Sequence, residues 1–257
     1  MTNEKRNDKL KELFGELKLV DKIKLLLIDD EVHFLEASKL YLESLNPNLA
    51  IITCSSAKEA LKKLSQNLFD VIVSDYMMKG MNGLDLLARL RAKGNTIPFI
   101  IFTGQGREEV AIQALNLGAD FWLQKGGDSE SQFRELINLI EKSYNQKQAE
   151  EKLRQTLEQQ KAQFHGTPVP VYIYEKQGDD FYLVDYNNSA LESTGSNIKK
   201  FLGIQASENT TFYPQVLQGL RRCYQTQKTI SDEITYIHPS TQEKLSLIHI
   251  SEPTRPY

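Results

Sequence analysis

Four short apolar runs in the first half of the chain each lead into polar residues. The pairs are Leu25–Ile28 with Asp29 and Asp30, Val71–Val73 with Asp75, Phe99–Phe102 with Thr103, and Phe121–Gln124 with Lys125. Runs of this length, separated by segments of helical period, are typical of strands in a βαβ series, and short right-handed crossovers place such strands in one parallel sheet. The carboxyl ends of the strands then share one edge, where ligands of open α/β sheets bind. Three carboxylates, a hydroxyl and an ammonium group are therefore predicted to meet there.

The same periodicities predict five β–α units between Lys22 and Tyr144. The strands are expected near Lys24–Ile28, Ala50–Cys54, Asp70–Ser74, Pro98–Phe102 and Phe121–Gln124. The helices are expected near Val32–Leu45, Ala57–Asn67, Leu84–Arg91, Glu108–Leu117 and Glu130–Tyr144. Gly118 follows the fourth helix in the position of a left-handed C-cap, and Asn82-Gly83 marks the loop before the third.

A polar segment over residues 145–163 contains neither Gly nor Pro and is predicted to continue the preceding helix as a connector. Leu153, Leu157 and Phe164 fall at a and d positions if Gln160 shares the seam. The pattern covers only about two heptads, fewer than a coiled coil normally needs. A dimer seam and an exposed helix both remain open.

After His165-Gly166 the chain becomes rich in aromatic and β-branched residues broken by Gly, Asp and Asn, which is typical of an antiparallel domain. Val171–Glu175 and Phe181–Tyr186 flank the turn signal Gln177–Asp180 and predict a hairpin. After the hairpin, short helices are expected over Asn188–Leu202. A longer helix is expected near Tyr213–Thr226, followed by a strand near Thr229–Ile237.

Composition narrows the class of protein. The 257 residues are enough for about two domains. Apolar residues make up 40% and charged residues 25%, and the net charge of −3 argues against a general binder of nucleic acid or membrane surfaces. No run approaches the roughly 20 apolar residues of a membrane span, and Met1–Glu12 is no signal peptide, so a cytoplasmic location is expected. Cys54 and Cys223 lack metal-ligand spacing and are predicted to be buried or half-buried thiols.

The acids at the strand ends are the oxygen ligands that Mg²⁺ prefers. Together with the ion, Thr103 and Lys125 would neutralise a phosphoryl group, and Asp75 is then the natural nucleophile for an acyl phosphate. Taken singly, each residue has an ordinary explanation, because Asp29-Asp30 suits a helix N-cap, Asp75 a turn, Thr103 a loop and Lys125 the surface. Their joint position at the ends of four strands favours the phosphoryl site.

Four motifs stand at these strand ends: Leu27-Ile28-Asp29-Asp30, Val73-Ser74-Asp75-Tyr76, Phe102-Thr103-Gly104 and Leu123-Gln124-Lys125. In order and spacing they resemble the receiver domain of two-component response regulators. The resemblance implies a flavodoxin-like, doubly wound α/β fold with Asp75 as phosphoacceptor. It implies Mg²⁺ held by Asp29, Asp30, Asp75 and the backbone carbonyl of Met77, and phosphoryl contacts from Thr103 and Lys125. Trp122 matches the aromatic switch position, whose rotation accompanies movement of Thr103; otherwise it is an ordinary aromatic at the edge of the core.

Two departures from the receiver pattern concern proline. The loop after the third strand reads Met78-Lys79-Gly80 where a Pro usually follows the Met, and Gly126 follows Lys125 where a Pro is common. A proline after Lys125 would make a rigid turn. Without it the Lys125 loop is expected to be looser, and the lifetime of the phosphoryl group is left open. The chemistry itself is expected to survive.

The second half carries the motifs Thr167-Pro168-Val169-Pro170-Val171, Asn187-Asn188-Ser189-Ala190-Leu191 and Leu202-Gly203. They resemble a PAS domain, which implies an α+β fold with an antiparallel sheet, used for sensing a small molecule or for dimerisation. No cofactor can be assigned, because His165, His238 and His249 lack a haem-ligand context and a flavin-photosensor cysteine motif is absent. A kinase phosphoacceptor role for His165 is rejected, since the following Gly and Pro would break the helix.

The leading interpretation is a phosphorelay protein without enzymatic activity beyond self-dephosphorylation. A partner histidine kinase would phosphorylate Asp75, and the helix would relay the change to the PAS-like module. A phosphatase of the haloacid dehalogenase type is a rival, but it would carry an Asp-x-Asp pattern after the first strand, whereas Asp29 and Asp30 are adjacent. A phosphorylation-independent scaffold and a fragment of a longer hybrid sensor kinase are further alternatives. A homodimer through the linker helix or the PAS-like region is also compatible with the sequence.

The chain is thereby divided into five regions. They are a helical or disordered extension (1–21), the receiver (22–144), a helical linker (145–165), a PAS-like domain (166–244) and a tail (245–257). Leu245–Arg255 looks like the in-frame translation of an adapter used in sequencing-library preparation, and Pro253 cannot donate to a sheet ladder. We therefore expect the tail to be non-native and without function and the PAS-like sheet to be truncated; a real terminal strand is the alternative.

Overall fold

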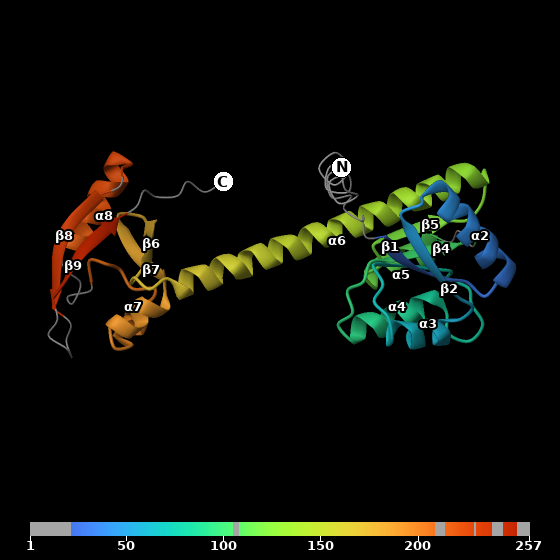
Figure 1. Ribbon diagram of the computed structural model, residues 1–257, viewed down its shortest axis with the longest axis horizontal. Coiled ribbons are helices and arrows are strands. Elements are labelled where there is room, and N and C mark those ends of the chain that lie inside the picture. The colour runs from blue at the N-terminus through green and yellow to red at the C-terminus, as the bar shows by residue number, and fades with distance from the viewer. Residues whose placement is uncertain (1–21, 105–107, 209–213, 229, 238–243, 251–257) are drawn as a thin grey trace, which may run out of the picture. The chain divides into compact units, whose positions relative to one another are not determined.

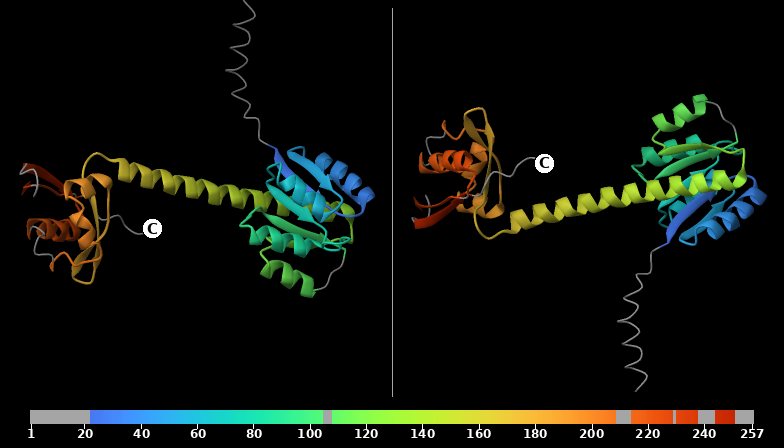
Figure 2. Two further views of the ribbon diagram at one scale, coloured as in Figure 1. Left: turned by 90° about the horizontal axis from the view of Figure 1, so that it is seen from below. Right: turned by 90° about the horizontal axis from the view of Figure 1, so that it is seen from above.

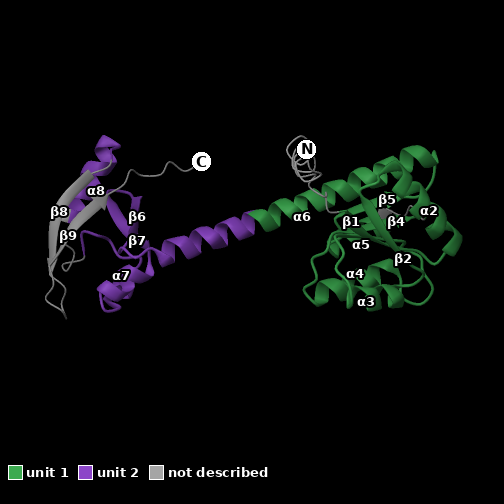
Figure 3. Cartoon of the chain, in the orientation of Figure 1, with its two compact units in different colours: residues 1–152 green, residues 153–257 purple. Residues whose placement is uncertain are grey.

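The computed structural model describes residues 22–104, 108–208, 214–228, 230–237 and 244–250. The chain divides into two compact units, residues 1–152 and residues 153–257 (Figure 3). The predicted extension over residues 1–21 and the last residues of the predicted tail, 251–257, lie outside the described residues.

A five-stranded parallel sheet with the strand order β2-β1-β3-β4-β5 forms the centre of the first unit (Figure 1). The strands are β1 (Ile23–Ile28), β2 (Leu49–Cys54), β3 (Val71–Ser74), β4 (Phe99–Thr103) and β5 (Phe121–Gln124). The prediction of one parallel, doubly wound sheet is confirmed. Each strand begins and ends within a residue of its predicted position, because buried apolar runs bounded by polar residues mark strand ends sharply.

Helices cover both faces of this sheet (Figures 1 and 2). They are α2 (Val32–Leu45), α3 (Ala57–Leu64), α4 (Gly83–Ala92), α5 (Glu108–Asn116) and the first part of α6 (Ser129–Gly166). Apolar residues of α3, α4 and α5 pack with one face of the sheet, and those of α2 and α6 with the other. The two buried clusters pack the sheet between the two helix layers.

The second predicted helix is shorter than expected, since α3 ends at Leu64 and the expected end at Asn67 is wrong. Ser65 Oγ donates to the Lys62 carbonyl at 2.7 Å, and Asn67 Nδ2 donates to the Lys63 carbonyl at 3.2 Å. Serine and asparagine side chains that bond nearby carbonyls compete with continuation of the helix.

The helix α6 runs without interruption for 38 residues, which confirms that the polar segment continues the last helix of the first domain. Phe133, Leu136 and Ile140 are buried against the sheet. Leu153 and Leu157, farther along, are 61% and 48% exposed. The dimer seam therefore stays a prediction.

The second unit contains two separate two-stranded antiparallel sheets, β6-β7 and β8-β9. Its elements are β6 (Tyr172–Gln177), β7 (Asp180–Tyr186), α7 (Asn188–Ser193), the 3₁₀ helix η1 (Asn197–Phe201), α8 (Pro214–Thr226), β8 (Ile230–Ile237) and β9 (Lys244–Ile250). The predicted hairpin is confirmed, with a tighter turn than expected. Gln177 pairs with Asp180, and Gly178 takes the positive φ of 59° that a two-residue turn favours.

The sequence predicted one antiparallel sheet for this unit. Among the described residues there are two sheets instead, and each strand pairs only with its neighbour along the chain. The apolar run at residues 245–250 belongs to β9, which pairs with β8. The helix α8 packs on the first hairpin, where the Tyr224 and Phe181 rings meet edge to face at 6.2 Å. The origin of the predicted tail stays a prediction.

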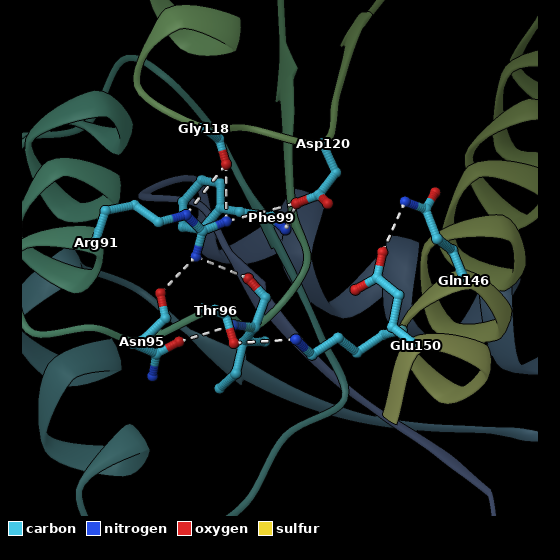
Figure 4. Close-up of polar contacts among 10 residues, drawn as sticks. Arg91, Asn95, Thr96, Phe99, Gly118, Asp120, Gln146 and Glu150 are labelled. Carbon is cyan, nitrogen blue, oxygen red and sulfur yellow. Dashed lines mark hydrogen bonds and ion pairs between the residues drawn. The ribbon is translucent and has the colours of Figure 1, made fainter. Parts of the chain in front are cut away.

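Arg91, near the end of α4, holds the amino-terminal edge of the large sheet (Figure 4). Its Nη1 donates to the Asn95 and Ile97 carbonyls at 2.9 and 3.0 Å. Its Nε and Nη2 donate to the Gly118 carbonyl at 3.1 and 2.8 Å, and Nη2 lies 3.5 Å from Asp120 Oδ2. Gly118 has the left-handed φ of 88° predicted for a C-cap.

Two further contacts extend this network. The Phe99 backbone N–H donates to Asp120 Oδ2 at 2.8 Å, which ties the start of β4 to the start of β5. Lys147 Nζ of α6 donates to Thr96 Oγ1 at 3.1 Å. The loops that lead into β4 and β5 are thus fixed from α4 and from α6.

Replacing Arg91 by Ala should lower the free energy of unfolding by about 2–3 kcal/mol, because three carbonyl groups lose a charged donor. Urea unfolding followed by circular dichroism measures the change. Arg89→Ala is the matched control, since Arg89 lies on the same helix and is exposed, and it should change stability by less than about 0.5 kcal/mol. Equal effects of the two substitutions would contradict the structural role of Arg91.

Candidate functional site

The carboxyl ends of β1, β3, β4 and β5 bring the predicted site residues to one edge of the sheet. Asp29 follows β1 and Asp75 follows β3; their residues are only 3% and 7% exposed. Lys125 follows β5, and its Nζ donates to Asp29 Oδ2 at 2.5 Å and to Asp75 Oδ1 at 3.0 Å. Thr103 ends β4 and is 1% exposed. Because the strands are parallel, side chains from distant parts of the chain meet here.

Asp30 and Met77 lie at the rim of this site. Asp30 Oδ2 accepts a hydrogen bond from the Lys79 backbone N–H at 3.2 Å, which joins the end of β1 to the loop after β3. A backbone hydrogen bond from Met77 reaches the Asp75 carboxylate. The sequence predicted a role for the Met77 carbonyl, but the N–H contact had no signal in the sequence.

The loop from β3 to α4 approaches Asp75 closely at Gly83. An added Cβ at this position would lie 2.3 Å from the Asp75 carbonyl oxygen and 3.2 Å from Ser74 Oγ. Only glycine fits such an approach. Asn82 and Asp85 form a capping box at the start of α4, which fixes the helix directly after this contact. The Asn82-Gly83 pair marked the loop in the sequence but not the need for glycine.

The Lys125 backbone is held from two sides. Its N–H donates to the Thr103 carbonyl at 2.7 Å. Gln132 Nε2 of α6 donates to the Gln124 and Gly126 carbonyls at 2.7 and 3.0 Å, on either side of Lys125. These bonds brace the backbone where receivers commonly carry a proline; the expected looseness of the loop stays a prediction.

Burial raises the pKa of Asp75 above its ordinary value. The Lys125 ammonium and the backbone hydrogen bond from Met77 oppose this rise, whereas the nearby negative charge of Asp29 adds to it. One ammonium group therefore compensates two buried carboxylates only in part, and the site retains an affinity for further positive charge.

Residues 25–141 match the family model of the response regulator receiver domain. These residues are a receiver domain. Response regulator SaeR of Staphylococcus aureus (strain USA300) is 36% identical over 101 residues, which cover 39% of this chain and 43% of SaeR. The match thus spans less than half the length of this curated relative.

Solved receiver structures are similar to the same part of the chain. The receiver domain of the Francisella response regulator 1452 has 30% sequence identity and a TM-score of 0.45, over 49% of this chain and 99% of that chain. A receiver domain protein from Clostridium thermocellum has 30% identity and a TM-score of 0.44, over 49% of this chain and 97% of that chain. In the part of the chain that the structure describes, no helix is long and apolar enough to cross a membrane.

The donor atoms of the receiver site fit Mg²⁺ by their chemistry. Carboxylate oxygens of Asp29, Asp30 and Asp75 and the backbone carbonyl of Met77 are hard ligands of the type this ion binds. Among the described residues, no three or more Asp, Glu, His or Cys side chains are arranged so that they could hold a metal ion as they stand. This includes the three carboxylates of the site. The Lys125 ammonium lies on two of them instead. An ion would thus share the carboxylates with Lys125.

Trp122 of β5 packs partly buried against the cluster formed with α3, α4 and α5. Its Nε1 is buried and has no hydrogen-bond partner among the described residues. The switch role of Trp122 stays a prediction.

Asp75→Asn should raise the melting temperature of the receiver at pH 7 in EDTA. Because the pKa of Asp75 is raised by folding, the folded protein binds more protons than the unfolded chain between the ordinary carboxylate pKa of about 4 and the raised value. Stability is therefore lost as the pH rises through this window, and asparagine removes that loss. Thermal melts from pH 4 to pH 8 measure it.

The advantage of Asp75→Asn should shrink as the pH falls toward about 4, where wild-type Asp75 is protonated. Glu36→Gln is the control, because Glu36 is an exposed acid of α2, and it should give no pH-dependent difference. A variant that is less stable than wild type at pH 7, or a difference that does not vary with pH, would contradict the assigned electrostatics.

Proposed function

We propose that the receiver domain acts in a two-component phosphorelay in which Asp75 accepts a phosphoryl group from a partner histidine kinase. The position of Lys125, with its Nζ at 2.5 Å from Asp29 and 3.0 Å from Asp75, is the observation that carries this proposal. It puts a mobile positive charge beside a buried carboxylate at the sheet edge where ligands of this fold class bind. A surface lysine or a structural ion pair alone would not require the second carboxylate.

In the proposed step an Asp75 carboxylate oxygen attacks phosphorus, and a new P–O bond forms. The P–N bond to the kinase imidazole breaks, and its electron pair leaves with the nitrogen. The product is an acyl phosphate on Asp75. The Lys125 ammonium has three donors on a flexible stem, so it can turn from the Asp75 carboxylate to a phosphoryl oxygen. Thr103, at the end of β4, is the proposed hydroxyl contact.

Mg²⁺ bound by Asp29, Asp30, Asp75 and the Met77 carbonyl would supply further neutralisation of the phosphoryl oxygens. The receiver itself positions groups and compensates charge, and it contributes no covalent catalysis beyond Asp75. We therefore propose no separate enzymatic activity, apart from hydrolysis of its own acyl phosphate.

For the second unit we propose a PAS-like sensory or dimerisation role, to which α6 relays the change in the receiver. The continuity of α6 from the buried Phe133 to Gly166 supports a mechanical connection. The antiparallel hairpins and short helices of residues 166–250 are compatible with the PAS resemblance. Leu153 and Leu157 are exposed apolar residues on the same helix, and native mass spectrometry of the purified protein would report both dimers and a retained ligand.

Incubation with acetyl phosphate and Mg²⁺ should phosphorylate Asp75, because a small donor needs only the charge complementarity of the site. Intact-mass spectrometry should show one added phosphoryl group, which should be acid-labile and should be removed by hydroxylamine. Asp75→Asn should abolish the addition. Unchanged labelling in that variant would overturn the choice of Asp75, and labelling from ATP alone would overturn the absence of kinase activity.

Beryllofluoride, which mimics the phosphoryl group, should quench or shift the fluorescence of Trp122, the single tryptophan of the chain. The expected cause is a change in the environment of the indole when Thr103 moves toward the bound anion. Asp75→Asn serves as the control and should show no response. A spectrum that is unaffected by beryllofluoride in the wild-type protein, although it binds, would argue against the switch.

A further inference from the structure

The Lys125 ammonium lies against aromatic rings as well as against carboxylates. Its Nζ is 4.4 Å from the centroid of the Phe34 ring and 5.5 Å from that of the Phe102 ring. Phe34 belongs to the first turn of α2, and Phe102 precedes Thr103 in β4. The electron-rich face of an aromatic ring attracts a cation at such distances. The ammonium therefore has a second set of partners that carry no net charge.

Three rings form a packed group behind Lys125, which we call the aromatic triad: Phe34, Phe102 and Phe133. Their centroids are 6.1 to 6.4 Å apart. The Tyr41 ring contacts Phe133 edge to face at 5.3 Å. Phe102 and Phe133 are 1% and 9% exposed, so these rings cannot leave the core. The triad is a packed surface supplied by α2, β4 and α6.

The two residues after Lys125 are glycines and have no side chains that could support the Lys125 side chain. Gly126 and Gly127 both have positive φ values, 138° and 87°, and an added Cβ at either would touch nothing within 4 Å. The hydrogen bonds of Thr103 and Gln132 hold the Lys125 backbone but not its ammonium. The position of the ammonium is thus set by the groups around its tip.

We infer that Phe34 and Phe102 are positioning residues for Lys125. The faces of their two rings hold the Lys125 ammonium beside the phosphoacceptor Asp75 by a cation–π interaction. The carboxylate partners change when an anionic group reaches Asp75, but the rings stay where they are. They keep the ammonium within reach of both Asp75 and an incoming phosphoryl oxygen. This inference rests on the proposed function and adds two residues to its machinery.

Phe34 is the residue to vary, because it is only half-buried whereas Phe102 is a core residue. In the full chain, Phe34→Leu should slow phosphorylation by acetyl phosphate about three- to thirtyfold, the range that the loss of a cation–π contact predicts. Mono-, di- and trifluorinated phenylalanine at position 34 keep the shape of the ring and progressively weaken its negative face. The rate should fall in the same order, at an unchanged melting temperature.

Phe121→Leu is the matched control. The Phe121 ring lies 5.0 Å from Lys142 Nζ, so this variant removes a cation–π pair that does not involve Lys125. It should leave the phosphorylation rate within twofold of wild type. A flat fluorination series, with or without a slower Phe34→Leu variant, would show that the ring only packs and would overturn the inference.

A second measurement does not depend on phosphorylation. Protons near an aromatic face shift upfield in NMR spectra, so the Lys125 Cε protons, assigned by their loss in Lys125→Arg, should be shifted upfield in wild type and return toward ordinary values in Phe34→Leu. An unshifted wild-type signal would overturn the inference. A shifted signal in a protein that acetyl phosphate does not label would instead overturn the proposed function and leave the aromatic contact established.

Discussion

Two buried carboxylates that share one ammonium group are the constraint on which the rest of the receiver depends. Asp29 and Asp75 are almost fully withdrawn from water, and Lys125 contacts both. Buried charges are tolerated only when they are paired, so β1, β3 and β5 must end at the same edge of the sheet for these contacts to form. One positive charge against two negative charges also leaves the site ready to take up further positive charge. The same feature thus restricts the fold and prepares the chemistry.

The two edges of the sheet use cations of different kinds. Arg91, at the amino-terminal edge, presents a planar guanidinium whose donors are engaged by the carbonyls of two loops. The donors of this planar group point in fixed directions, so the guanidinium holds the two loops in one relative position. Lys125, at the carboxyl edge, carries a compact ammonium on a flexible stem, held by exchangeable carboxylates and by ring faces. The fold therefore has a rigid end, which sets the register of β4 and β5, and an adjustable end, which meets ligands.

The helix α6 belongs to two environments. Its first part buries Phe133 in the aromatic triad. Glu141 Oε1 accepts a hydrogen bond from Nδ2 of Asn46, the residue that caps the end of α2, at 2.8 Å. Most of the later residues of α6 are polar and exposed. Lys147 adds a contact to the loop before β4. The sequence predicted this continuous helix because no Gly or Pro interrupts it. The strands β6, β7 and β8 of the second unit were also predictable as local apolar runs, whereas a strand at β9 was only the alternative to a non-native tail. The division into two sheets was not predictable, since pairing beyond the nearest neighbour is not encoded in a local pattern.

The sequence by itself determined the strands, nearly all helix limits and the acids, hydroxyl and lysine at the strand ends, because apolar period and polar boundaries report local burial directly. It also marked Gly118 as a C-cap. Only the tertiary structure decided which groups touch: that Lys125 bridges Asp29 and Asp75, that Phe34 lies beneath its ammonium, and that Gly83 must lack a Cβ. These contacts join residues from different strands, helices and loops, and they depend on strand order and side-chain packing. Periodicity along one segment carries no information about either.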